Sequence, residues 1–98
     1  PRCHALRTAL ICATGRGRTE VIRLLLEDGR VQVDACDGQG RTALWHACNR
    51  GSKTDASMLL VEGRADHTVA CVEGETPMDV ARRRFRGPCV RLLEVRVN

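Results

Sequence analysis

The chain repeats itself every 34 residues, and this period limits its possible folds more than any other feature. Thr8, Thr42 and Thr76 lie 34 residues apart, and each opens a short, largely apolar segment. The same shift superposes pairs of glycines: Gly17 on Gly51, Gly29 on Gly63 and Gly40 on Gly74. A fixed period of this length indicates stacked repeat units, each of which buries its apolar side against its neighbours.

Each unit is predicted to begin with a capped helix. Threonine is a favourable N-cap residue, and at Thr76 it is followed by Pro77, which suits the first helical position. In the first unit, Thr8 is the predicted cap and the helix is expected from about Ala9 to Thr14. Its predicted buried residues are Leu10 and Ala13.

A second helix and a projecting turn are predicted to complete each unit. In the first unit this helix is expected from about Thr19 to Glu27, with an apolar face formed by Val21, Leu24 and Leu25. The repeated glycines are predicted to end helices or to form turns with positive φ. Asp37-Gly38 is a strong tight-turn signal and predicts a hairpin-like finger, which residues 72–75 repeat one unit later.

The composition favours helices and a single domain. The 98 residues include no Tyr, one Trp and one Phe, so a core of small aliphatic residues and Cys is expected rather than a β-sandwich. Free, reduced thiols are expected, because Cys12, Cys48 and Cys89 occupy apolar helical positions. No membrane-spanning run and no signal-peptide pattern is found, so we expect an intracellular chain, cytoplasmic or nuclear.

The second unit carries the motif with the clearest family likeness. Residues 42–44 read Thr-Ala-Leu and are followed by Ala47 and Gly51, then by Leu59-Leu60 and Gly63, while residues 37–42 read Asp-Gly-Gln-Gly-Arg-Thr. This combination resembles the ankyrin repeat in register across essentially the whole chain. The tetratricopeptide repeat shares the 34-residue period, but it requires aromatic positions and a terminal Pro that are absent here.

The resemblance implies an all-α solenoid of helix-loop-helix units with projecting hairpin-like turns. We expect one domain over residues 1–98, divided into units of about 5–37, 38–71 and 72–98, which can be a fragment of a longer chain. Where ankyrin units usually carry His, this chain has Ile11, Trp45 and Asp79. Asp79 is predicted to form a capping box with Thr76. No Asp-Gly finger precedes Thr8, which indicates either a modified N-terminal capping unit or the boundary of a fragment of a longer protein.

The ankyrin resemblance also implies a non-catalytic module that binds a partner protein through its concave groove and its fingers. Arg16, Arg50 and Arg84 share one repeat phase and are expected to form a ladder with roughly the 8 to 10 Å spacing of packed helices. Such a row suits an acidic or phosphorylated protein segment. The candidate binding residues are Arg16, Gln39, Arg41, Trp45, Asn49, Arg50, Glu73, Glu75, Arg83 and Arg84.

Other interpretations of these residues stay open. The arginine row can equally be a solvated face, or it can bind a nucleic-acid backbone. Trp45 is either an interface hot spot or a core residue beneath a finger. The basic run 82–86 fits a helix C-terminus better than a nuclear-import signal. The chain can also be the targeting segment of a larger enzyme or a ubiquitin-ligase adaptor.

No cofactor or metal site is predicted. His46 and Cys48, and likewise His67 and Cys71, combine possible zinc ligands, but the chain has no Cys-x-x-Cys pair and Cys48 is expected in the core with Thr14. No glycine pattern matches a phosphate-binding loop, and no third group completes a Cys-His nucleophile. Membrane binding is not expected either.

Overall fold

The computed structural model describes the backbone of residues 5–97 and the side chains of residues 9–95. These residues form six helices: α1 (Ala5–Gly15), α2 (Thr19–Asp28), α3 (Ala43–Arg50), α4 (Lys53–Val61), α5 (Pro77–Arg83) and α6 (Gly87–Val97). Within the described part there are no strands, and a single isolated antiparallel bridge joins Cys36 to Thr42. The predicted all-α class is confirmed.

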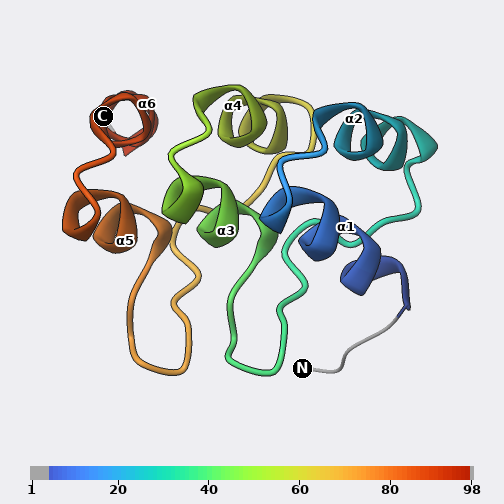
Figure 1. Cartoon of the computed structure of the whole chain (residues 1–98), viewed down its shortest axis with the longest axis horizontal. Coiled ribbons are helices and arrows are strands. Elements are labelled where there is room, and N and C mark those ends of the chain that lie inside the picture. The colour runs from blue at the N-terminus through green and yellow to red at the C-terminus, as the bar shows by residue number, and fades with distance from the viewer. Residues whose placement is uncertain (1–4, 98) are drawn as a thin grey trace.

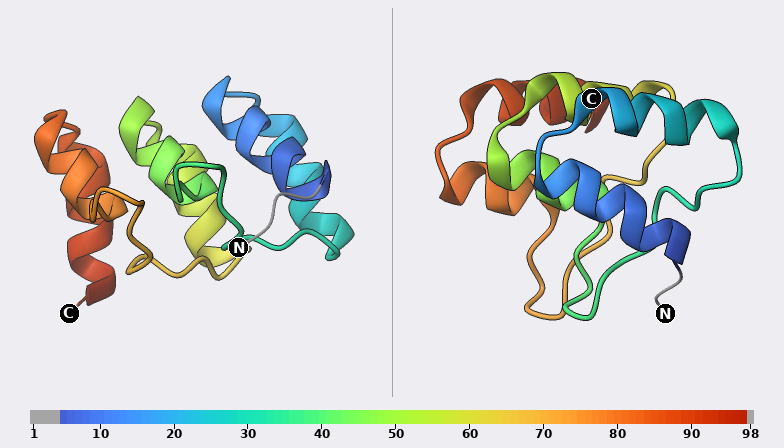
Figure 2. Two further views of the ribbon diagram at one scale, coloured as in Figure 1. Left: turned by 90° about the horizontal axis from the view of Figure 1, so that it is seen from below. Right: turned by 45° about the vertical axis from the view of Figure 1, so that its right-hand side comes forward.

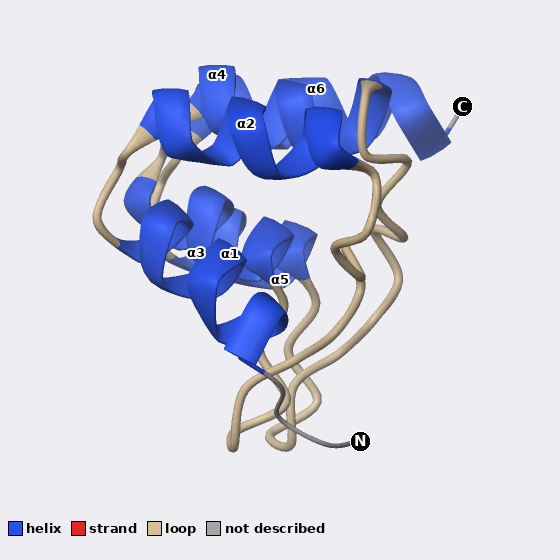
Figure 3. Ribbon diagram, turned by 90° about the vertical axis from the view of Figure 1, so that its right-hand side faces the viewer, coloured by secondary structure: helices blue, strands red, loops and turns tan. Residues whose placement is uncertain are grey.

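The helices stack in two layers, with α1, α3 and α5 in one and α2, α4 and α6 in the other (Figure 1). Each helix packs against its equivalent in the next unit and against its partner in the same unit. We call residues 5–37, 38–71 and 72–98 units one, two and three, and each holds one helix pair. The two loops between units project away from the helix layers as fingers (Figures 2 and 3).

Threonine hydroxyl groups cap the first helix of units two and three, α3 and α5, as predicted. We call these first helices the inner helices. The Thr42 hydroxyl accepts a hydrogen bond of 3.1 Å from the Trp45 N–H, and the Thr76 hydroxyl accepts one of 3.2 Å from the Asp79 N–H. The Asp79 carboxylate accepts a bond of 3.0 Å from the Thr76 N–H, which completes the predicted capping box. Each such cap contributes about 1 kcal/mol of helix stability.

Unit one departs from this pattern at its start. Helix α1 begins at Ala5, so Thr8 lies inside the helix and the prediction that it is the N-cap is wrong. Ala5, Leu6 and Arg7 are strong helix formers, and no turn sequence interrupts them, so the helix extends toward the N-terminus. The Thr8 side chain lies outside the described side chains.

The core lies between the two layers and includes the predicted Leu10 and Ala13. In α2, however, the fully buried residue is Ile22, while Val21 is 40% exposed and Leu24 is 63% exposed. The prediction is therefore wrong at Val21 and Leu24, whereas the predicted Leu25 is partly buried and packs against the core. Two apolar stripes with helical spacing share this helix. The stripe containing Val21 and Leu24 faces the open end of the stack.

The glycine predictions are confirmed with one exception. Positive φ angles occur at Gly17, Gly29, Gly40, Gly51 and Gly74. Gly63 does not adopt one, and the left-handed residue of that turn is Arg64, with φ of 54°. Gly63 instead allows a close approach, because a Cβ atom there would lie 2.8 Å from the Leu59 carbonyl oxygen. In unit three the position of Gly51 is taken by Phe85, with φ of 58°.

Candidate partner-binding groove

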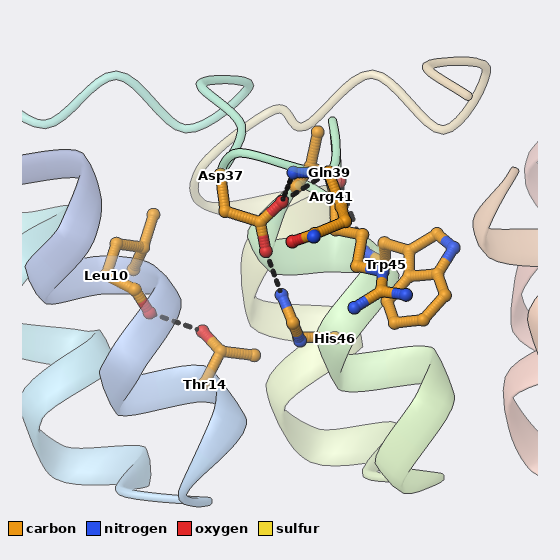
Figure 4. Close-up of polar contacts among 8 residues, drawn as sticks. Leu10, Thr14, Asp37, Gln39, Arg41, Trp45 and His46 are labelled. Carbon is orange, nitrogen blue, oxygen red and sulfur yellow. Dashed lines mark hydrogen bonds and ion pairs between the residues drawn. The ribbon is translucent and has the colours of Figure 1, made fainter. Parts of the chain in front are cut away.

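The first finger is held by the carboxylate of Asp37. Its Oδ1 atom accepts hydrogen bonds of 2.9 Å from the N–H groups of Gln39 and Arg41, and Oδ2 lies 3.1 Å from His46 Nε2 (Figure 4). Burial would raise the pKa of Asp37, but hydrogen bonds from Arg41, His46 and Gln39 outweigh burial and hold the pKa below its usual value. The finger is therefore tied to α3 through His46.

The two fingers also contact each other. The Val72 N–H donates a hydrogen bond of 2.8 Å to the Gln39 carbonyl oxygen, and Gly40 lies so close that a Cβ there would be 3.0 Å from the Val72 nitrogen. Each finger closes its own turn with the same kind of bond: Asp37 N–H to Arg41 carbonyl in the first, and Cys71 N–H to Glu75 carbonyl in the second. The predicted hairpin-like turns are present, and backbone pairing fixes their spacing.

Arg41 and Trp45 stack on each other at the base of the first finger, beside the predicted groove. The Arg41 guanidinium carbon lies 4.7 Å from the centroid of the Trp45 ring, and His46 contacts this ring edge-on at 5.3 Å. Trp45 is only 4% exposed, so of its two predicted roles the structure shows the core position. Arg41 covers the indole from the finger side (Figure 4). Trp45 Nε1 and Arg41 Nε are buried donors with no hydrogen-bond partner.

In unit three, the residues at the repeat positions of Arg41 and Asn49 form an ion pair. Glu75 occupies the repeat position of Arg41, and Arg83 occupies that of Asn49. The Arg83 Nε atom donates to Glu75 Oε2 at 2.6 Å and Nη2 donates to Oε1 at 3.1 Å, a bidentate arrangement. Glu75 and Arg83 therefore neutralise each other, while Glu73 stands exposed at the tip of the second finger.

The predicted arginine ladder lies at the loops between the paired helices, at the other end of the inner helices from the fingers (Figure 3). Arg50 Nη1 donates a bond of 3.4 Å to the Gly15 carbonyl oxygen of unit one, and the Arg50 guanidinium covers Gly17. In unit three this bridging role falls to Arg86, whose Nε donates to the Asn49 carbonyl oxygen at 3.1 Å, and not to Arg84.

The structure thus separates the ten candidate residues into two places. Near the fingers lie Gln39, Arg41, Trp45, Glu73 and Glu75, and the side chain of Arg83 reaches Glu75 from the last turn of α5. Near the inter-helix loops lie Arg16, Arg50 and Arg84, all exposed, with Asn49 partly buried on α3. That any of them binds a partner stays a prediction. Sequence reasoning missed the anchoring roles of Asp37 and His46, although an Asp before Gly is a known signal for side-chain-to-backbone bonds.

The basic run 82–86 is mostly engaged within the fold. Arg82 and Arg83 lie in the last turn of α5, where cations complement the helix dipole. Arg82 approaches Glu94 of α6 at 3.8 Å, Arg83 pairs with Glu75, and Arg86 binds unit two. The predicted helix-terminal position of this run is confirmed.

The histidine and cysteine pairs do not gather into a larger ligand set. Cys48 is fully buried, as is Thr14, which confirms their predicted core phase. A hydrogen bond with Cys89 and burial raise the pKa of the Cys48 thiol far above its usual range, so this group stays protonated. Cys12, in contrast, is exposed on α1, against the expectation of an apolar position. Among the described side chains, no three His, Cys, Asp or Glu residues lie close enough to hold a metal ion.

The helices are too short and too polar for a bilayer. Across the described residues, none of them combines the length and the apolar character needed to cross a membrane.

Comparison with known proteins agrees with this architecture. A family model described as ankyrin repeats (three copies) matches residues 2–71. The chain is 36% identical over 91 residues to ankyrin repeat and KH domain-containing protein mask-1 of Caenorhabditis elegans, covering 93% of this chain and 3% of that protein. It is 42% identical over 81 residues to human ankyrin repeat domain-containing protein 63, covering 79% of this chain and 21% of that protein.

A further relative is protein phosphatase 1 regulatory subunit 12A of Mus musculus, which is 38% identical over 74 residues, or 76% of this chain and 7% of that protein. The chain therefore spans only a small part, from 3% to 21%, of the length of these three relatives. With its paired helices joined by projecting fingers, with threonine caps on α3 and α5, and with the family model matching most of its length, the chain belongs to the ankyrin repeat family.

Proposed function

We propose that the chain is a non-catalytic module that binds an acidic segment of a partner protein in the groove beside the first finger, centred on Arg41 and Trp45. Ankyrin repeats are generally protein-interaction modules, and one relative is named as a regulatory subunit of protein phosphatase 1. The partner's carboxylate or phosphate group binds Arg41, and the buried Trp45 supports the guanidinium from the core side.

The unpaired state of Arg41 carries this proposal. In unit three the groove arginine, Arg83, already has a bidentate carboxylate partner in Glu75. No carboxylate among the described residues pairs with Arg41, and its buried Nε lacks an acceptor. Arg41 as a whole is only partly buried, so a partner's carboxylate or phosphate can pair with its guanidinium through charge-assisted hydrogen bonds. An Arg stacked on Trp is also a combination that dominates binding energy at interfaces.

Selection of binding peptides from a random library tests the proposal without assuming a particular partner sequence. A random 12-residue peptide library displayed on phage is selected against the full chain, and the enriched peptides are then synthesised. We expect enrichment of Asp and Glu, and we expect phosphoserine in place of one acid to be tolerated. Arg41→Gln should weaken binding of these peptides about tenfold, the effect of losing one charge-assisted hydrogen bond. Fluorescence polarisation measures the affinities.

Arg91→Gln is the matched control, since Arg91 is an exposed arginine on the outer helix α6. It should leave peptide affinity unchanged. Equal losses for Arg41→Gln and Arg91→Gln would reduce the effect to net charge and contradict the proposal. So would a 12-nucleotide single-stranded DNA that binds more tightly than the selected peptides and weakens steeply with salt, because that result is typical of phosphate-backbone binding.

A further inference from the structure

We propose that Cys48 and Cys89 form a redox modification site, at which a small-molecule disulfide of the glutathione class converts the two thiols into one reversible disulfide bond. Cys48 lies on α3 of unit two and Cys89 on α6 of unit three, so the bond would link neighbouring units of the stack (Figure 1). Neither thiol takes part in the contact between Arg41 and Trp45, so the inference does not depend on the proposed function.

The two thiols meet in the core between units two and three. Both cysteines are fully buried, and their thiols share a hydrogen bond. A second contact joins the same two helix ends: Arg86, directly before α6, donates a hydrogen bond of 3.1 Å from its Nε to the carbonyl oxygen of Asn49, the residue after Cys48. Two separate contacts therefore hold the end of α3 against the start of α6.

The two thiols differ in acidity, because they lie at opposite ends of their helices. Cys89 is the third residue of α6, near the positive end of the helix dipole, and Cys48 lies in the last turn of α3, near a negative end. The hydrogen bond from Cys48 and the charge of Arg86 lower the pKa of Cys89 below its usual value, although burial opposes them. Because the thiolate is the attacking form, Cys89 is the nucleophile and Cys48 is the resolving thiol.

The oxidation consists of two thiol–disulfide exchange steps. The Cys89 thiolate attacks one sulfur of oxidised glutathione, whose S–S bond breaks, and the first glutathione leaves as a thiolate that takes up a proton. The Cys48 thiol then loses its proton and attacks the Cys89 sulfur of this mixed disulfide, which releases the second glutathione, again as a thiolate that takes up a proton. The protein loses two electrons and two protons, and glutathione gains both.

Burial controls how fast this reaction can occur. Neither cysteine is accessible to glutathione in the closed fold. Helix α6 packs mainly against α4 and α5, so local opening of this one helix exposes Cys89 while units one and two stay folded. When α6 closes again, Cys48 meets the mixed disulfide and resolves it. Oxidation should therefore be slow, and urea below the unfolding transition should accelerate it.

Oxidation of the full chain tests the site. The chain carries Cys12→Ser, which removes an exposed thiol that would compete for glutathione. After equilibration with oxidised glutathione under native conditions, the remaining thiols are alkylated and the chain is digested with trypsin. We expect mass spectrometry to find peptide 42–50 cross-linked to peptide 87–91, and dithiothreitol to separate them. The melting temperature of the oxidised chain should rise by about 5–10 °C, since the bond closes a long loop.

Single substitutions assign the two roles. Cys48→Ser removes the resolving thiol and should trap glutathione on Cys89, whereas Cys89→Ser removes the nucleophile and should leave Cys48 unmodified. Cys71→Ser is the matched control, since Cys71 is a buried cysteine at the base of the second finger, and the cross-link should form in it as in the parent. Circular dichroism confirms that each variant is folded.

Two results would overturn the proposal. One is a chain whose Cys48 and Cys89 stay reduced at equilibrium with oxidised glutathione, both without urea and with urea below the unfolding transition. The other is a cross-link that forms only when the chain is unfolded, because the contact between the thiols in the fold would then play no part in it.

Discussion

Units two and three build the same backbone with different chemistry on the groove side. At one equivalent position, unit two has Arg41, which stacks on the buried Trp45, and unit three has Glu75, which pairs with Arg83. The threonine caps and the turn hydrogen bonds are the same in both units. The repeat plan therefore depends on caps and turns, while the groove residues are free to differ, and that freedom lets one unit present an unpaired cation and the next a neutral ion pair.

The largest expected difference between the units concerns the residue three positions after the capping threonine, which is Trp45 in unit two and Asp79 in unit three. Trp45→Ala should lower the free energy of unfolding by about 3–5 kcal/mol, because it removes a large buried side chain. Asp79→Ala, at the equivalent position, removes one half of an exposed capping box and should cost about 1 kcal/mol. Urea denaturation measures both. Similar losses for the two variants would contradict the view that this position is core in one unit and cap in the other.

The residues of this position also show how far sequence reasoning reaches. The caps at Thr42 and Thr76 and the capping box of Asp79 could be predicted, because each depends on residues no more than three positions apart. The burial of Trp45 could not be decided, since it depends on Arg41 and on packing between units. Local chemistry is readable from one sequence, whereas the choice among nearby partners requires the fold.

Packing between units also decides two features that the sequence alone could not: the buried face of α2 and the arginine that hydrogen-bonds to the preceding unit. Ile22 and Leu26 have helical spacing just as Val21 and Leu24 do, so only the position of the neighbouring unit decides which stripe is buried. Likewise Arg84 has the repeat phase of Arg50, but the bridge to unit two comes from Arg86, which directly precedes α6.

The two fingers differ in their anchors, and this difference predicts a pH effect. Finger one is held by the Asp37 carboxylate, whereas the equivalent residue in finger two is the buried Cys71. Because the folded-state pKa of Asp37 is lowered, its contribution is fully present above the unfolded pKa of about 3.9 and is lost as the pH falls through the folded value. Asp37→Asn should therefore cost about 1–2 kcal/mol at pH 7 and progressively less at lower pH.

Urea titrations at pH 7, 5 and 3 measure this dependence. Glu73→Gln on finger two is the control, since Glu73 is an exposed carboxylate outside the hydrogen bonds of the Asp37 turn. Its effect at pH 7 should be small. A cost of Asp37→Asn that is the same at pH 7 and pH 3 would show that the charge of Asp37 does not hold the finger.

The smallest expected difference lies in the loops between paired helices, where unit two has Gly51 and unit three has Phe85, both with positive φ. A left-handed conformation strains any residue with a Cβ, and the Phe85 side chain is 92% exposed, so its removal loses few contacts. Phe85→Gly should therefore raise stability by about 0.5 kcal/mol, the relief of strain being partly offset by the greater freedom of glycine in the unfolded chain. The reverse change, Gly51→Ala, should be destabilising, because a Cβ there would lie 2.7 Å from Arg86 Cδ and would add the same backbone strain. Thermal denaturation of both variants measures the two effects, and a loss of stability in Phe85→Gly would mean that the exposed ring stabilises the loop more than its backbone strain destabilises it.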